Sequence, residues 1–360
     1  MFVSVLSVIF VFGVLIVAHE LGHLWTARRF GVRVELFTFG FGPRLFGFRR
    51  GETLYQVALI PFGGAVKLAG EESLGKKEPK RDEYFGRPPG ERALILVMGS
   101  VHNFILGFLL FTLAFSLGVQ TFNYRQPLVG EVKKGFPAES AGLKSGDLVL
   151  SVEGKKVTDW FSLSEEIRRY PDKAITLIVE RKSEILKVKV MPKRERIIDS
   201  RGEKTIGLIG IFPVITKEKM NLFQAFLRAG KESGRVVGLV FYYLGKLITR
   251  KVSSRELAGP IGIAQLTSQF AKAGLSNFIS FLALLSINLS VVNLFPLPFL
   301  DGGHLVGVLI ERVRRRRPSR RFLEVGQALG LFLIILLALF VTYNDLLRIS
   351  NIHLKIFGRK

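Results

Sequence analysis

The chain has 360 residues, of which 48% are hydrophobic, and its mean hydropathy is positive at +0.33. It is too apolar for an ordinary soluble enzyme, yet its 22% of charged residues make it too polar to lie in a membrane throughout. The net charge of +23 would suit a nucleic-acid binder, but no binding module is recognisable, so we expect no nucleic-acid partner. Cysteine is absent, which leaves His, Asp and Glu as candidate metal ligands.

Four apolar stretches reach the roughly 18 residues that a transmembrane helix needs. The first could be a signal peptide, but it lacks a basic start and a small-residue cleavage site, so we interpret it as a mature span. The fold class that we expect is a polytopic α-helical membrane protein with about four transmembrane helices. These are Phe2 to about Ala27, Ala93–Val119, Phe278–Leu300 and Val325–Val341.

Charge predicts the orientation of the spans. Lys and Arg gather in the loop between the first two spans and in the loop between the last two, which includes the run Arg314–Arg317. By the positive-inside rule both loops face the cytoplasm, so both termini are expected outside. The stretch between the second and third spans exceeds the roughly 60 residues within which charge sets orientation, so it can lie outside the cytoplasm.

The remaining segments predict smaller elements in chain order. Residues 53–68 predict a membrane-associated β-hairpin with its turn at 61–64, and residues 71–92 predict a polar surface loop. Short strands, turns and one helix in 126–193 predict a small inserted α/β domain. Residues 221–248 are amphipathic and favour an interfacial helix, with a re-entrant segment left open. We therefore expect four regions: 1–125, with the first two spans and the hairpin; 126–193, the inserted domain; 194–276, a linker with the amphipathic helix; and 277–360, with the last two spans.

The first span carries His19-Glu20-Leu21-Gly22-His23, which matches the H-E-x-x-H pattern. On a helix, His19 and His23 face the same way and can bind one zinc ion, while Glu20 can act as general base toward water. Two imidazoles and a carboxylate inside an apolar helix are costly unless they face a partner or a cavity. A buried polar network without metal is the alternative.

A catalytic zinc needs a third protein ligand. His19 lies roughly 26 Å along the first span, near its cytoplasmic end. The third span also enters from outside and ends at the same level in Asn293-Leu-Phe-Pro-Leu-Pro-Phe-Leu-Asp301-Gly-Gly, where two prolines break the helix. Asp301 is the expected ligand, with a turn-forming aspartate as its alternative; His102 and His304 are weaker candidates.

The two metal motifs together resemble the site-2 protease family of intramembrane zinc metalloproteases. The segment Phe136-Pro-Ala-Glu-Ser-Ala-Gly-Leu143, followed by Ser145-Gly-Asp147, resembles a PDZ domain, and this arrangement resembles the bacterial branch that regulates sigma-E. Where that family usually has proline after a glycine of the second span, this chain has Gly99-Ser100, while Asn103 still matches the family. Some relatives carry two PDZ domains, whereas one is recognisable here.

The resemblance implies an endopeptidase that uses Zn²⁺ as cofactor and Glu20 as general base near the cytoplasmic side of the inner membrane. It implies a single-span substrate, such as an anti-sigma factor already cleaved once outside, and remnant signal peptides as further substrates. The periplasmic PDZ-like domain either binds a newly exposed C-terminus or excludes bulky substrates. The substrate-binding residues that we expect are Asn103, Asn288, Asn293, Pro296, Pro298, Gly63 and Gly64.

Two alternatives concern these roles. The asparagines could make interhelical hydrogen bonds instead of binding substrate. The edge of the hairpin could accept an unwound substrate strand, or the hairpin could be a structural plug.

Other functions are also possible for a chain of this kind. A PDZ-bearing membrane adaptor without catalysis would be expected to have a broken metal set, whereas His19, Glu20, His23 and Asp301 are all present. A transporter would need paired broken helices in two symmetric halves, and one broken segment is visible.

Overall fold

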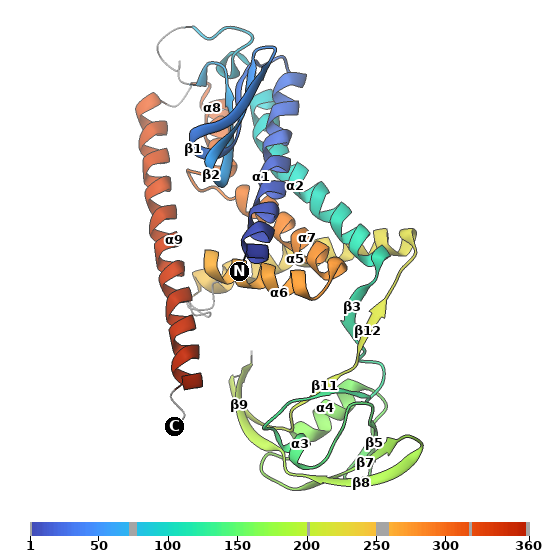
Figure 1. The fold of residues 1–360 in the computed structure, drawn as a ribbon. Coiled ribbons are helices and arrows are strands. Elements are labelled where there is room, and N and C mark those ends of the chain that lie inside the picture. Colours follow the sequence, from blue (N-terminus) through green and yellow to red (C-terminus); the bar gives the residue numbers. More distant parts are fainter. Residues whose placement is uncertain (1, 72–77, 200–201, 250–258, 317–318, 358–360) are drawn as a thin grey trace. The chain divides into compact units, whose positions relative to one another are not determined.

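A computed structural model describes residues 2–71, 78–199, 202–249, 259–316 and 319–357 (Figure 1). The chain forms two compact units, which are described here one at a time. The membrane unit consists of Met1–Leu117 and Met220–Lys360, and the inserted unit consists of Gly118–Lys219.

Within the described residues, the membrane unit has four helices that are long and apolar enough to cross a bilayer, so the predicted number of spans and the multi-pass fold are confirmed. The third span ends seven residues before the expected Leu300, because a turn that contains Pro296 and Pro298 interrupts the helix and a new one begins at Asp301. The helices are α1 (Phe2–Arg29), α2 (Pro89–Leu117), α7 (Leu275–Asn293), followed by α8 (Asp301–Arg314), and α9 (Arg320–Phe357).

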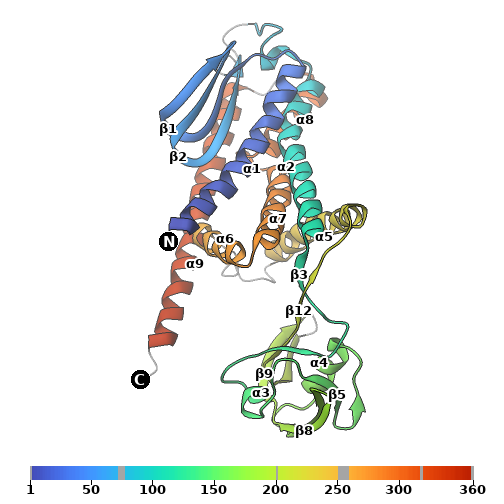
Figure 2. The ribbon, with the colours of Figure 1, turned by 45° about the vertical axis from the view of Figure 1, so that its right-hand side comes forward.

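Helix α2 runs beside α1 and packs on α1, α7 and α8 (Figures 1 and 2). Glycines in α1 and α2 allow the backbones of neighbouring helices to approach each other closely. A Cβ atom added at Gly22 of α1 would lie closer than 3.0 Å to the carbonyl oxygen of Met98, and one at Gly107 of α2 would meet Ile287 and the carbonyl oxygen of Ala283. These close contacts fix α1 and α7 on the two sides of α2.

A β-sheet packs beside α1, and its topology differs from the predicted hairpin (Figure 2). The turn lies at Gly51–Glu52, between β1 (Val34–Arg50) and β2 (Thr53–Leu68). Residues 36–39 of β1 pair with both 54–57 and 64–67 of β2, so they lie between the two arms that we expected to pair with each other. The bend of β2 includes Gly63, whose φ of +97° suits glycine.

Two further helices complete the membrane unit: α5 (Leu222–Ile248) and α6 (Pro260–Lys272). Helix α5 covers the predicted amphipathic segment and is not among the candidate spans of the described residues. Its Phe226 ring packs edge-on against Phe108 of α2. Helix α6 was not predicted. Its N-terminus is capped by the buried Asp345 of α9, which accepts hydrogen bonds from the backbone N–H groups of Gly259 at 3.2 Å and Gly262 at 2.9 Å.

The inserted unit is built around a four-stranded sheet of order β6-β5-β7-β8. Its described residues also form three further strand pairs, β3–β12, β4–β11 and β9–β10. Its core packs Trp160 and Leu163 of α4 against sheet residues such as Val149 and Leu177. The elements are β3 (Val119–Phe122), β4 (Val129–Val132), α3 (Pro137–Ser140), β5 (Leu148–Val152), β6 (Lys155–Lys156), α4 (Trp160–Arg168), β7 (Ile175–Arg181), β8 (Glu184–Val190), β9 (Lys193–Asp199), β10 (Gly202–Leu208), β11 (Ile211–Pro213) and β12 (Ile215–Glu218).

The inserted unit extends beyond the expected 126–193 on both sides. Strand β3 precedes that range and pairs with β12, while β9, β10 and β11 lie in the stretch that we expected to be a linker. Strand β11 also pairs along β4, with Ile211 opposite Val132. For recruitment, the sequence predicts a peptide groove between the strand at 128–132 and the helix at 162–169. In the structure β11 pairs with an edge of β4, so that edge is not open to a peptide strand.

A buried ion pair stabilises this unit and gives a prediction about pH. Asp147 is fully buried, and Arg181 donates to its two carboxylate oxygens at 2.6 and 2.7 Å. Burial alone would raise the pKa of Asp147, but the hydrogen bonds from Arg181 and the Lys144 backbone outweigh it, and the pKa is lowered. Because the folded pKa lies below the unfolded one, the stabilisation is present above the unfolded pKa and is lost as pH falls through the folded pKa.

We expect Asp147→Asn to lower the free energy of unfolding of the inserted unit by about 3 kcal/mol at neutral pH, since it breaks a buried pair. The difference from wild type should stay constant between about pH 7 and pH 5 and shrink below about pH 3.9, the ordinary pKa of aspartate. Chemical unfolding of both proteins across this range measures it. A difference that stays unchanged down to about pH 2 would contradict the assignment.

Candidate active site

Helix α1 brings His19 and His23 together one turn apart. Their Nε2 atoms lie 3.2 Å from each other, and the two rings meet edge to face. The Nδ1 of His23 lies 2.8 Å from the carbonyl oxygen of Ile95 on α2. If Nδ1 carries the proton and donates there, Nε2 keeps its lone pair and is available to a metal.

Asp301 reaches the same point from α8. Its Oδ2 atom lies 3.0 Å from the Nε2 of His19 and 3.4 Å from the Nε2 of His23. The preceding turn is tight. Cβ atoms added at Gly302 or Gly303 would collide with the carbonyl oxygens of Leu294 and Leu297, so glycine is needed at both positions. This explains why the aspartate is followed by two glycines.

The three atoms form a triangle whose edges are 3.0, 3.2 and 3.4 Å long. Tetrahedral zinc with bonds of about 2.0–2.1 Å places its ligand atoms about 3.3 Å apart, so the triangle has the size of one face of a zinc site. The Oδ2 of Asp301 is buried without a hydrogen-bond partner in the part of the chain that the structure describes, as expected of an atom that serves a metal. Two imidazoles and a carboxylate also form a donor set that zinc prefers, so the residues fit this ion.

Glycine on α2 makes room for the histidine rings. A Cβ atom at Gly99 would lie closer than 3.0 Å to the imidazoles of both His19 and His23. The sequence motifs did not reveal this role, nor that of the Ile95 carbonyl group. A glycine inside an apolar helix is the signal that could have indicated a close approach.

Glu20 lies on the same helix, beside the arm of β2 that forms the edge of the sheet. A Cβ atom at Gly64 would stand 3.2 Å from the Cγ of Glu20, and the Glu20 carboxylate contacts the backbone of Val66. The edge strand and the carboxylate are therefore neighbours. Gly63 lies in the bend just before this arm, where its Cβ would meet the ring of Phe41.

Of the predicted substrate-binding residues on the helices and in the turn before Asp301, one asparagine lies directly beside the metal triangle. Asn293 lies at the site, with its Nδ2 atom 3.3 Å from the Nε2 of His19. Asn103 is fully buried on α2, and neither polar atom of its side chain has a hydrogen-bond partner among the described residues. Asn288 is half-buried on α7, while Pro296 and Pro298 lie in the turn that precedes Asp301.

The two competing histidines lie outside the triangle. The Nδ1 of His102 lies 2.8 Å from the carbonyl oxygen of Met98 in its own helix, and its ring packs against Trp25. His304 follows Asp301 by three residues and is half-buried. Among the described residues, the group of side chains that could share one metal ion is His19, His23 and Asp301.

Comparison with known proteins agrees with this geometry. The family model described as Peptidase family M50 matches residues 7–337. The chain belongs to this family. It is thus a zinc metalloprotease of the site-2 type that acts within the membrane, and the catalytic interpretation is favoured over the adaptor.

Relatives in the M50 family match over nearly the whole chain. The zinc metalloprotease RasP of Geobacillus kaustophilus is 30% identical over 95% of this chain and 97% of its own length. The regulator of sigma-E protease RseP of Salmonella typhimurium is 30% identical over 94% and 97% of the two chains. The regulator of sigma-W protease RasP of Bacillus subtilis is 29% identical over 97% and 100%. Among solved structures, the PDZ domain of an SdrC-like protein from Listeria monocytogenes matches 26% of this chain and 93% of its own, with 22% identity and a TM-score of 0.21.

Proposed function

We propose that this M50 protease holds zinc on His19, His23 and Asp301 and cleaves transmembrane segments of single-span membrane proteins. The observation that carries the proposal is the triangle of ligand atoms, with edges of 3.0 to 3.4 Å, next to the Glu20 carboxylate. Zinc bound there supplies Lewis acidity toward a carbonyl group and toward water. Glu20 takes a proton from the attacking water and passes it to the leaving amine.

The edge of the β-sheet gives the substrate its place. A transmembrane helix has its amides bonded internally, so it must unwind before a carbonyl group can reach the site. Residues 64–68 pair with β1 on one side. On their other side they pair with no strand among the described residues. A substrate strand added there would exchange helical hydrogen bonds for sheet hydrogen bonds beside Glu20. This favours strand addition over a structural plug.

Polar side chains of the spans are proposed to hold the substrate backbone. Asn293 is adjacent to His19, and the buried Asn103 has an amide group whose hydrogen bonds are unmade among the described residues. An unmade hydrogen bond of a buried amide is costly, so a substrate carbonyl or N–H group could satisfy it. We assign Asn288, which lies five residues before Asn293 on α7, to the same substrate-binding surface. Pro296 and Pro298 of the following turn are assigned to it as well.

We infer the substrate class from the relatives. RseP and RasP bear names that state regulation of sigma factors, so we propose a membrane-spanning anti-sigma factor, first cleaved outside, as substrate, and remnant signal peptides as further substrates. The basic loops favour a cytoplasmic side for the triangle and a periplasmic inserted unit in the inner membrane. The direct test is cleavage of a single-span substrate by the purified protein in liposomes, with a zinc chelator as control; chelator-resistant cleavage would contradict it.

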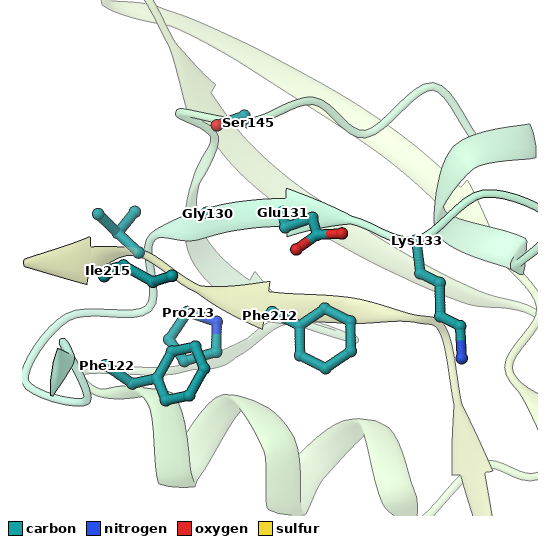
Figure 3. Close-up of a pocket in the computed structure, with 9 residues that line it drawn as sticks. Phe122, Gly130, Glu131, Lys133, Ser145, Phe212, Pro213 and Ile215 are labelled. Carbon is teal, nitrogen blue, oxygen red and sulfur yellow. The ribbon is translucent and has the colours of Figure 1, made fainter. Parts of the chain in front are cut away.

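The inserted unit is proposed to act as a size filter, with recruitment of a trimmed C-terminus as the alternative. For recruitment, the unit offers an apolar pocket of about 540 Å³ beside β4 and β11, which Phe122, Phe212 and Ile215 line (Figure 3). For a filter, the unit needs no tight binding, since bulk alone excludes a folded substrate domain. The two roles predict opposite effects of deletion.

If the unit is a filter, its removal should permit cleavage of substrates that still carry a bulky outer domain. Val119 of β3 lies opposite Glu218 of β12, so the chain enters and leaves side by side and a short Gly-Ser linker can replace 118–219. Intact and trimmed substrates are compared with intact and deleted enzyme in the same membrane. If deletion leaves the intact substrate uncut and abolishes cleavage of the trimmed one, recruitment replaces the filter.

A further inference from the structure

A buried ion pair joins the helix that carries Asp301 to α2. Arg92, in the first turn of α2, is 1% exposed, and its Nη2 lies 2.6 Å from the Oε1 of Glu311 on α8. Its Nε donates to the carbonyl oxygen of Arg87 at 3.1 Å, and its guanidinium carbon lies 5.8 and 5.6 Å from the ring centres of Tyr84 and Phe85. The guanidinium group is thus held on several sides.

The pair sets the position of α8 along α2. Glu311 follows Asp301 by ten residues, which is about 15 Å of helix at 1.5 Å per residue. The first turn of α8 is fixed by the close approach of Gly302 and Gly303 to the preceding loop. Glu311 fixes the other end, so α8 is held at both ends and cannot slide or tilt freely.

The same face of α2 also holds the histidines. Arg92, Ile95 and Gly99 are three and four residues apart, so they lie on one side of the helix. The carbonyl group of Ile95 contacts the Nδ1 of His23, and Gly99 gives space to both imidazole rings. One helix therefore positions the two halves of the site, which are 278 residues apart in the chain between His23 and Asp301.

We propose that Arg92 and Glu311 are positioning residues that place the Asp301 carboxylate at the two histidines and thereby set the affinity for zinc. The proposal rests on the ligand set of the proposed function. A buried ion pair is weak evidence for stability, because an apolar pair of similar volume often packs as well. Its directional hydrogen bonds, by contrast, define one register of α8, and the triangle tolerates little displacement of the Asp301 oxygen.

The test measures zinc affinity directly, by competition with a chromophoric chelator, in purified protein in nanodiscs. Glu311→Gln and the double variant Arg92→Met with Glu311→Met are compared with wild type. The double variant removes both charges together, so no charge is left buried alone and the protein should fold. The matched control is Asp147→Asn, which breaks a similarly buried pair with Arg181 in the inserted unit.

We expect both test variants to bind zinc about 10-fold more weakly, at the lower end of the range for partners bonded directly to a metal ligand, because the pair acts on Asp301 through α8. The control should bind zinc like wild type. At saturating zinc, cleavage by Glu311→Gln should recover with an unchanged KM, because the pair does not touch substrate. Wild-type zinc affinity in the folded double variant would overturn the proposal, whatever its activity. Failure of the wild type itself to bind zinc would instead contradict the proposed ligand set.

Discussion

The Glu20→Gln variant is expected to keep its zinc and lose hydrolysis. The amide keeps the shape of the side chain next to Val66 but cannot take a proton from water. General-base catalysis contributes about 10²–10⁴-fold, so cleavage of a single-span substrate should fall by at least about 100-fold. Metal analysis and cleavage rates of the same preparation measure both effects.

The control for this variant is Glu52→Gln, an exposed carboxylate in the turn between β1 and β2. It should cleave at the wild-type rate. A chelator arm excludes a contaminating protease. Turnover by Glu20→Gln within a few-fold of wild type, abolished by the chelator, would remove Glu20 from the general-base role.

The second large effect is expected for Asp301→Ala, which should lose zinc. The variant removes one corner of the triangle and leaves two imidazoles, which cannot complete a catalytic site. Changes beside a metal ligand already cost about 10–100-fold in affinity, so loss of the ligand itself should cost more than about 100-fold. Chelator competition on the purified variant measures the affinity.

His304→Ala and His102→Ala are the matched controls, since both histidines lie near the site without belonging to the triangle. Each should retain stoichiometric zinc. Retention of zinc by Asp301→Ala together with its loss in either histidine variant would move the third ligand to that histidine.

The sequence predicted those features of the fold that depend on a short stretch of residues alone. Apolar length predicted four spans, and two prolines predicted the break that precedes Asp301, because neither signal depends on distant partners. Shared depth in the membrane also predicted that Asp301 and His19 would approach each other. The structure brings these residues within hydrogen-bonding distance.

The sheet could not be predicted in the same way. Strand β1 contains Gly40, Gly42, Pro43 and Gly47, residues typical of turns, and two of these glycines adopt positive φ angles within the strand. Pairing with residues 56–60 of β2 keeps this stretch extended, and residues 36–39, which precede it, pair with both arms of β2. The Arg92–Glu311 pair depends likewise on contact across 219 residues, and a local pattern assigns both side chains to the solvent.

The cap that Asp345 places on α6 has a consequence for how the chain enters the membrane. Aspartate is among the least favourable residues in a helix that partitions into lipid, and α6, with 13 residues or about 20 Å, is too short to cross a bilayer alone. The donors, Gly259 and Gly262, precede Asp345 by 86 and 83 residues, so they have already been synthesised when α9 leaves the ribosome. The cap of α6 is therefore complete only once the last helix is in place, and each segment then supplies the polar partner that the other lacks.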